Sequence, residues 1–343
     1  MSDFFGIDLG VGTTKIVALT KDQKGTIILD GIGETRTPNI DWQKGGAKGK
    51  ALSQMTDAVK SLISDLRLKA RQTVATLPED EVVSRLINLP PLKETEIRDA
   101  LKFEAETFVP YPLDQVSIDY EVVEQDEGGR LSVFAIAARN DLIQSYIKLF
   151  KNMGLELIAL ESPAVSMKRA VNLSIPQVGG AIVVDMGEKY SDIIGLANGN
   201  IRFTRSMSVG GESLTRAISI NLSLDMASAE EYKKAYGMKE MELEGKIKAA
   251  ITPVFSSMAE EIRRAMTLFA EERGKAADIL VLSGGGANLP GLAEELTRTL
   301  GIEVQVIQPF VKIDTSKINV PINLNSDGCR FSIAVGSALR GLV

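Results

Sequence analysis

The chain has 343 residues, of which 44% are hydrophobic and 24% are charged, and its formal net charge is −6. It has no histidine and one cysteine, Cys329, which excludes Ser-His-Asp and Cys-His nucleophilic sites, histidine metal ligands, intrachain disulfides and thiolate metal clusters. The acidic balance argues against a nucleic-acid partner, and no apolar run approaches the roughly 18 residues of a membrane span.

Strand-like and helix-like segments alternate from the first residues onward, which is typical of an α/β fold. No basic, hydrophobic signal segment precedes the first strand, so we expect a cytoplasmic protein, where one unpaired cysteine is ordinary. In chain order, the first 77 residues predict strands over 4–8, 15–20, 26–31 and 72–77 and an amphipathic helix around 52–66.

The next segment, 78–159, predicts a small β-α-β-β-α insert with its own core. Alternating apolar residues in its second strand should put Val116, Ile118, Tyr120 and Val122 on one side. We expect strands over 81–89, 116–123 and 131–138, a helix over 94–109 that ends at Pro110, and a helix from about 140 to Met153.

The α/β pattern resumes at Ala181. We expect strands over 181–185, 191–197, 201–207 and 279–282, helices over 213–222 and 227–236, a long helix or helix pair over 244–272, and a last helix from about Ser332 to the C-terminus.

An internal repeat is the most informative feature of the sequence. Residues 5–10 align with 182–187, and residues 16–19 align with 193–196, at a separation of 177 positions. Each half is a hairpin with an aspartate near the end of its first strand, Asp8 or Asp185, and a glycine two residues later. Two related halves that face each other predict a ligand cleft between them.

The residues of the first hairpin suit a polyphosphate. Gly10 and Gly12 let backbone amides approach an anion, the hydroxyls of Thr13 and Thr14 are further donors, and Lys15 is positively charged. Asp8 and Asp185 would repel phosphates unless Mg²⁺ and its waters lie between them. One such hairpin is more often an ordinary tight turn, but two matching hairpins favour a nucleotide. The spacing fits neither a dinucleotide fingerprint nor a Walker P-loop.

Two later glycine motifs complete the predicted site, although each alone is ordinary turn or helix chemistry. The turn after the strand over 279–282 would let adenosine or an α-phosphate approach closely, and the 210–233 region offers ribose or base contacts. The candidate nucleotide contacts in this half are Gly187, Ser191, Gly210, Gly211, Glu230, Lys233, Gly284, Gly285, Gly286 and Asn288.

The second hairpin departs from the first in its turn. Glu188 would repel a phosphate, and Lys189 stands where the first hairpin has Gly12. This weakens the case for rapid hydrolysis more than the case for binding, because hydrolysis also needs an oriented attacking water.

These motifs resemble those of the actin-like ATPases, a family that includes FtsA, MreB and the sugar kinases. Residues 8–15 resemble its first phosphate motif, 185–192 its second and 283–288 its adenosine motif, while 161–164 and 334–338 occupy the places of two connecting helices. The resemblance covers essentially the whole chain. It implies an actin-like (ribonuclease-H-like) two-lobed α/β fold around a cleft for ATP and Mg²⁺, with Asp8 and Asp185 holding the metal through water. The implied parts are a first lobe over 1–77 with 160–178 and 331–343, an FtsA-type insert over 78–159, and a second lobe over 179–330.

Within that superfamily, residues 89–92, 96–106, 108–113 and 119–120 closely resemble the PilM family of type IV pilus assembly proteins. The resemblance implies an ATP-binding cytoplasmic scaffold that is peripheral to the inner membrane through its partners. The implied partners are the N-terminal peptide of a PilN-like bitopic membrane protein, docked at the insert and its junction with the first lobe, and other pilus platform or motor proteins. A homo-oligomer and slow ATP hydrolysis are left open.

Two alternatives also stay open. An FtsA-like division filament would carry an amphipathic membrane tail, and the chain ends soon after its last predicted helix. A sugar-kinase-type phosphotransferase would need a carboxylate base near the γ-phosphate, and the sequence contains no convincing motif for one.

Overall fold

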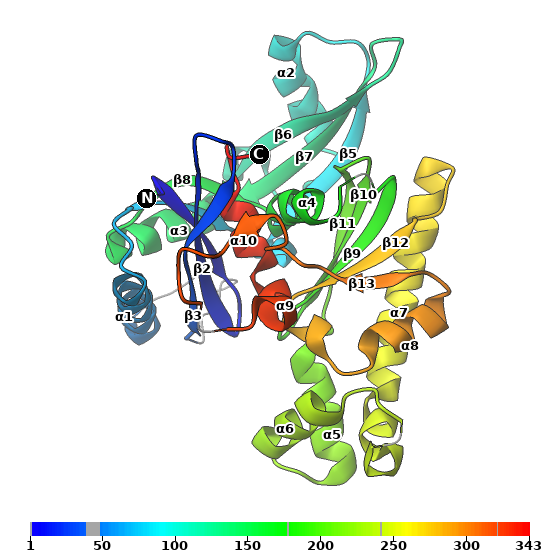
Figure 1. Cartoon of the computed structure of the whole chain (residues 1–343). Helices are drawn as coiled ribbons and strands as arrows, with labels where there is room; N and C mark the ends of the chain where they lie inside the picture. Colours follow the sequence, from blue (N-terminus) through cyan, green and yellow to red (C-terminus); the bar gives the residue numbers. More distant parts are fainter. Residues whose placement is uncertain (1, 39–48, 177, 241, 321) are drawn as a thin grey trace.

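A six-stranded sheet forms the centre of the first lobe (Figure 1). The computed structural model describes residues 2–38, 49–176, 178–240, 242–320 and 322–343. In the sheet order β14-β3-β2-β1-β4-β8, the strands are β1 (Phe4–Leu9), β2 (Thr13–Lys21), β3 (Ile27–Arg36), β4 (Gln72–Thr76), β8 (Glu156–Glu161) and β14 (Ile313–Asp314). One face packs against α1 (Gly49–Asp65) and α3 (Asn140–Met153), and the other against α10 (Ser332–Ala338).

The second lobe is built on a five-stranded sheet in the order β11-β10-β9-β12-β13. The long helix predicted over 244–272 is one continuous helix, α7, that runs through Pro253. The strands of the second lobe are β9 (Gly180–Met186), β10 (Ser191–Ala197), β11 (Asn200–Met207), β12 (Ile279–Ser283) and β13 (Val304–Val306). Its helices are α5 (Gly211–Leu222), α6 (Met226–Tyr236), η3 (Glu242–Gly245), α7 (Lys246–Arg273), η4 (Gly285–Asn288), α8 (Leu292–Leu300), α9 (Leu324–Asp327) and η5 (Gly328–Phe331). The predicted α/β class is confirmed, although the last helix, α10, stops at Ala338 rather than at the C-terminus.

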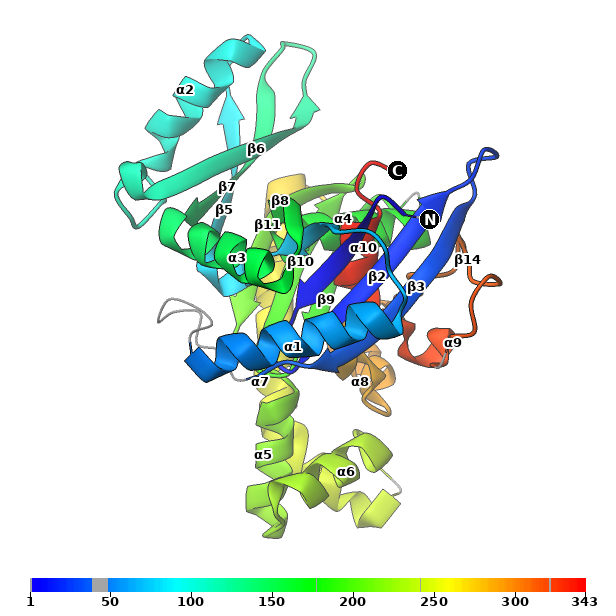
Figure 2. The same cartoon turned by 90° about the vertical axis from the view of Figure 1, so that its left-hand side faces the viewer.

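A three-stranded sheet and one helix project from the two lobes, at the end of the molecule opposite to α5 and α6 (Figures 1 and 2). The sheet order is β5-β7-β6, and α2 covers one face through Ile97 and Leu101. The elements are η1 (Glu79–Glu81), β5 (Val82–Leu89), α2 (Glu94–Ala105), η2 (Leu113–Gln115), β6 (Val116–Gln125) and β7 (Leu131–Arg139). We call β5, α2, β6 and β7 the insert.

The end of the predicted insert differs in the structure. The helix expected to complete it, α3, packs Tyr146 and Phe150 into the core of the first lobe, and β8 pairs with β4 in the six-stranded sheet. The packing therefore places residues 140–159 mainly with the first lobe, since α3 shares its core with α1 and β1, and only Ala138 of β7 and Val82 of β5 join that core from the insert.

A bulge interrupts β6 after Val122. Val122 pairs with Val133 and Glu124 with Ser132, so Val123 is the extra residue. The register is unbroken from Val116 to Val122, so the predicted alternation holds over these residues. Val122 is exposed, whereas Val123, beyond the alternating run, packs into the core of the second lobe.

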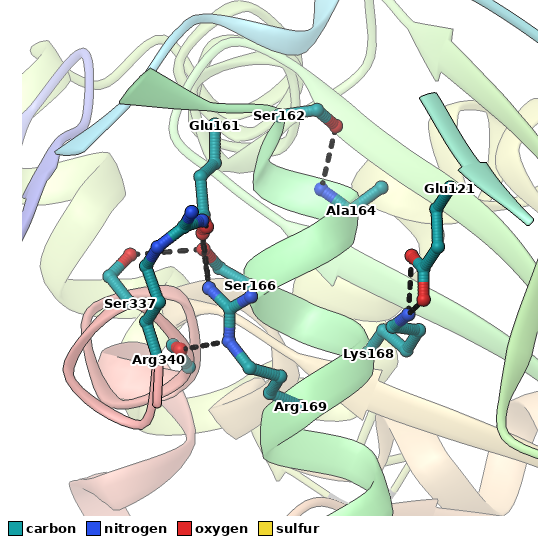
Figure 3. A network of polar contacts seen from close by, with 10 residues as sticks. Glu121, Glu161, Ser162, Ala164, Ser166, Lys168, Arg169, Ser337 and Arg340 are labelled. Atoms are coloured by element: carbon teal, nitrogen blue, oxygen red, sulfur yellow. Dashed lines mark hydrogen bonds and ion pairs between the residues drawn. The ribbon is translucent and has the colours of Figure 1, made fainter. Parts of the chain in front are cut away.

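Two helices connect the lobes and cross each other. They are α4 (Pro163–Ser174) and α10, and a Cβ added at Gly336 would overlap the carbonyl oxygen of Ser166. Figure 3 shows Glu161 next to this crossing, where its carboxylate accepts hydrogen bonds from Arg169 and Arg340. Within the part of the chain that the structure describes, no helix is both long enough and apolar enough to cross a membrane.

Candidate functional site

The two hairpins of the sequence repeat have the same backbone geometry. Asp8 pairs with Lys15 across β1 and β2, and Asp185 pairs with Asp192 across β9 and β10. In each turn a Cβ on the first glycine would lie 2.8 Å from a backbone oxygen three residues on, that of Thr13 for Gly10 and that of Tyr190 for Gly187. Glycine is needed at both positions for this close approach. We call residues 10–13 the first loop and residues 187–190 the second loop.

The first hairpin holds an ion pair near the end of β1. Asp8 is 8% exposed, and Lys15 Nζ lies 3.3 Å from its Oδ2. Burying a charged group costs free energy unless an opposite charge lies beside it. Asp8 therefore stays close to a cation at the end of β1.

The second hairpin places two carboxylates where the first has one carboxylate and one ammonium group. Burial raises the pKa of Asp185 to about 6, against the effect of a hydrogen bond from Ser283, and the charge of Asp8 raises it further. Burial also raises the pKa of Asp192 well above its usual range, and the negative charge of Glu79 raises it further. The influence of Asp8 on Asp185 indicates that both lobes direct negative charge into the same region.

Sequence reasoning missed Asp192 and Glu79. The hairpin register carries a signal for Asp192, since it occupies the position that Lys15 holds in the first repeat. Glu79 carries no local signal. It is 7% exposed, its Oε2 accepts a hydrogen bond of 2.7 Å from Ser162, and its Oε1 has no hydrogen-bond partner among the described residues.

Two predicted hydroxyl donors have partners inside the protein. Thr14 Oγ1 lies 2.9 Å from Thr37 Oγ1 in the interior, and Ser191 Oγ donates to the Val209 carbonyl oxygen at 2.6 Å. Contacts from these two hydroxyls to a phosphate stay a prediction. Strand side chains alternate between faces, so the residue before Lys15 or Asp192 lies on the opposite side. Thr13, on the same side as Lys15, remains a candidate donor.

The two loops contact each other. A Cβ added at Gly12 would overlap the carboxylate of Glu188, so this side chain lies directly on the first loop. The start of α5 holds the second loop from behind, since the Gly211 amide donates to the Gly187 oxygen at 3.0 Å and the Glu212 amide to the Glu188 oxygen at 2.8 Å.

The candidates on α5 and α6 are bonded to one another. Lys233 Nζ donates to the Gly211 oxygen at 3.0 Å and lies 2.6 Å from Glu230 Oε2, while Thr215 also donates to Glu230. A Cβ on Gly210 would come within 2.5 Å of the Glu188 oxygen. These residues hold α6 and the second loop on α5, and contacts to a ribose or base stay a prediction.

The glycine turn after β12 lies on the second hairpin. Gly284 has a φ of +80°, and a Cβ there would come within 2.5 Å of the Met186 oxygen, while one on Gly286 would come within 2.7 Å of the Met186 Cβ. A Cβ on Gly285 would meet no atom within 4 Å, and Asn288 Oδ1 accepts a hydrogen bond from the Cys329 thiol at 3.2 Å. The turn therefore lies close to the second loop, with open space at Gly285.

This arrangement suits an anion that brings its own cation. Among the described residues, no three Asp, Glu, Cys or His side chains are grouped to hold a bare metal ion. Mg²⁺ usually keeps several waters and takes one or two carboxylates together with substrate phosphates. Asp8 and Asp185 fit that donor set, whereas Glu188 opposes an anion.

Asp185→Asn should raise the melting temperature at pH 7.5. The folded-state pKa of Asp185 is raised to about 6, so its contribution to stability is present at low pH and is lost as the pH rises through that value. The difference between the variant and the wild type should shrink as the pH falls below about 6 and disappear below about pH 4, the ordinary pKa of an aspartate in the unfolded chain, as followed by thermal unfolding. Asp57→Asn, on the exposed face of α1, is the matched control. An Asp185→Asn effect that is equally large at about pH 4 and pH 7.5 would contradict this assignment.

Comparisons with known proteins show a family and a fold for this chain. A family model described as type IV pilus assembly protein PilM matches residues 6–342. The chain is similar to a solved PilM-PilN type IV pilus biogenesis complex, with 26% identity, coverage of 99% of both chains and a TM-score of 0.86.

More distant similarities extend to two other proteins. FtsA, a cell division protein of Streptococcus pneumoniae serotype 2 (strain D39), is 20% identical over 352 residues, which cover 89% of this chain and 75% of FtsA. The structure of MreB 5 of Spiroplasma citri bound to AMPPNP is 14% identical, with a TM-score of 0.53 over 98% of this chain and 95% of that one. The predicted actin-like ATPase fold is thereby confirmed.

Proposed function

This chain belongs to the type IV pilus assembly protein PilM family, and from that premise we propose that it is a cytoplasmic, ATP-binding scaffold of the inner-membrane pilus platform that binds the N-terminal peptide of a PilN-like membrane protein. Its place at the inner membrane would then come from its partners. The observation that carries the nucleotide part is the matched pair of hairpins, whose Asp8 and Asp185 lie close enough for the charge of Asp8 to raise the pKa of Asp185.

In this proposal Mg²⁺ lies near Asp8 and Asp185 through its waters and neutralises the phosphates when it is bound. The first-loop amides, Thr13 and Lys15 would hold the β- and γ-phosphates. The turn at 284–286 would lie against adenosine. AMPPNP in the similarly folded MreB 5 supports the choice of an adenine nucleotide.

The peptide would dock where the insert meets the first lobe. The PilM-PilN complex among similar structures supports this partner. At that junction Arg139 lies over the ring of Tyr111, at 5.7 Å from its centroid, and also pairs with Glu81 of η1. Tyr111 is 40% exposed, so it offers both apolar surface and a hydroxyl to a peptide.

The insert also contacts the second lobe, which suggests a route between the two ligands. Arg202 of β11 pairs with Glu124 of β6 at 2.5 Å, Asn200 donates to the Val123 oxygen at 2.8 Å, and the hydroxyls of Ser84 and Thr204 lie 2.8 Å apart. A rotation of the second lobe around bound ATP would shift these contacts. Nucleotide binding and peptide binding should therefore be coupled.

Calorimetric titration of a synthetic PilN-like N-terminal peptide, with and without Mg-ATP, tests this proposal. We expect Mg-ATP to tighten peptide binding about tenfold in the wild type, within the usual range of coupling between two sites. Arg202→Ala should reduce that factor below about threefold, because it removes a contact between β11 and the insert. Arg205→Ala, at an exposed position of the same strand, should keep it. Peptide affinity that is indifferent to Mg-ATP in the wild type would refute the coupling, and no peptide binding would refute the partner.

A further inference from the structure

The Glu188 carboxylate of the second loop lies against the Gly12 backbone of the first loop, which suggests a function for the turn of the second hairpin. The first loop offers backbone amides and Lys15, whereas the second loop directs a carboxylate onto the Gly12 backbone. The sequence repeat places Glu188 where the first loop has Val11, so this charge appears in one half of the repeat only.

The backbone around Glu188 is held in place while its side chain reaches the other lobe. Its carbonyl oxygen accepts the Glu212 amide, and Gly210 packs against that same oxygen. The neighbouring cation, Lys189, lies on another side of the turn. It lines a surface cavity together with Glu212, Ser213 and Arg216 of α5. Glu188 is therefore not neutralised by Lys189 where it meets the first loop.

We propose that Glu188 sets the preference between nucleoside diphosphate and triphosphate, by placing a carboxylate beside the position of the terminal phosphate. This inference rests on the proposed nucleotide function and goes beyond it. In a cleft that holds Mg-nucleotide between the two loops, a triphosphate extends further toward the second loop than a diphosphate. Two like charges about 4 Å apart repel each other, with a strength that depends on the solvent between them. Because only the terminal phosphate of a triphosphate would come this close to the Glu188 carboxylate, the repulsion should weaken triphosphate binding more than diphosphate binding.

Mg-ATP and Mg-ADP titrations of wild type and Glu188→Gln test the assignment. We expect the substitution to tighten Mg-ATP binding about tenfold and Mg-ADP binding less than about twofold, since the side chain is exposed and its charge is partly screened. The control is Glu212→Gln, which removes a neighbouring carboxylate that pairs with Arg216 at 2.9 Å and should change neither affinity.

The possible outcomes separate the two proposals. A shift confined to Mg-ATP in Glu188→Gln supports the assignment. Equal Mg-ATP affinities in wild type and Glu188→Gln, or equal gains for both nucleotides, overturn it while the nucleotide function stands. If neither protein binds either nucleotide, the nucleotide function fails and the assignment fails with it. Thermal unfolding of each variant confirms that the proteins compared are folded.

Discussion

Asp8→Asn should weaken Mg-ATP binding by about 10- to 100-fold, the range found when a group that orders a metal's outer shell is lost. The substitution keeps the size of the side chain and removes the charge that would face Mg²⁺ and its waters. It also frees Lys15, whose ammonium group lies 3.3 Å from Asp8 and could then move toward a phosphate. That gain offsets part of the loss, so the effect should be larger for Mg-ATP than for ATP in the presence of a chelator. Calorimetry with and without Mg²⁺ measures both.

The control for Asp8→Asn is Asp57→Asn, which removes one negative charge from the exposed face of α1 in the same lobe. It should leave nucleotide binding unchanged. Peptide binding in the presence of Mg-ATP should weaken together with nucleotide binding in Asp8→Asn, because the two are proposed to be coupled. Unchanged Mg-ATP affinity in a folded Asp8→Asn protein would remove Asp8 from the site.

Gly336→Val should destabilise the fold by at least about 3 kcal/mol, at the upper end of the range for overpacked interiors. Gly336 is buried in α10, and even a Cβ there would overlap the Ser166 carbonyl oxygen of α4. The Ser166 atoms that this Cβ would meet belong to the backbone, so they cannot move aside as the end of a flexible side chain would. Ser166 and Ser337 Oγ atoms lie 3.0 Å apart beside it, and Arg169 Nε donates to the Gly336 oxygen at 2.7 Å (Figure 3), so separated helices would also lose these bonds.

Urea unfolding measures this loss as a lower midpoint. Gly285→Ala is the matched control, because a Cβ there meets no atom within 4 Å and its backbone is not in the left-handed region. It should leave the midpoint unchanged. A Gly336→Val midpoint equal to that of the wild type would show that α4 and α10 do not cross as closely as described.

Local patterns in the sequence predicted most elements and the repeat, because apolar periodicity and turn glycines act within one segment. Asp8 and Lys15 were identified for the same reason, since both belong to one hairpin. The side of the sheet on which Thr14 and Ser191 lie could have been predicted from the sequence. Strand alternation alone puts Thr14 on the side opposite to Lys15, and Ser191 on the side opposite to Asp192.

Other features depend on segments far apart in the chain. The apolar face of α3 suits any sheet of the right shape, and only the assembled first lobe shows that α1 and β1 cover it. The groups around the Glu79 carboxylate include Ser162, at the N-cap of α4, and residues of the second lobe. These lie more than 80 positions from Glu79 in the sequence. The bulge at Val123 inserts one residue and leaves the alternation intact on either side of it. A period-two pattern in the sequence therefore does not show where the bulge lies.

The most direct test of the nucleotide cleft is amide hydrogen exchange of the wild-type chain with and without Mg-ATP. We expect Mg-ATP to slow exchange in three separate segments at once, residues 10–13, 187–190 and 284–288, because the proposed ligand lies between them. Slowed exchange in none of the three, with Mg-ATP shown to be bound by calorimetry, would contradict a nucleotide site formed by the two hairpins.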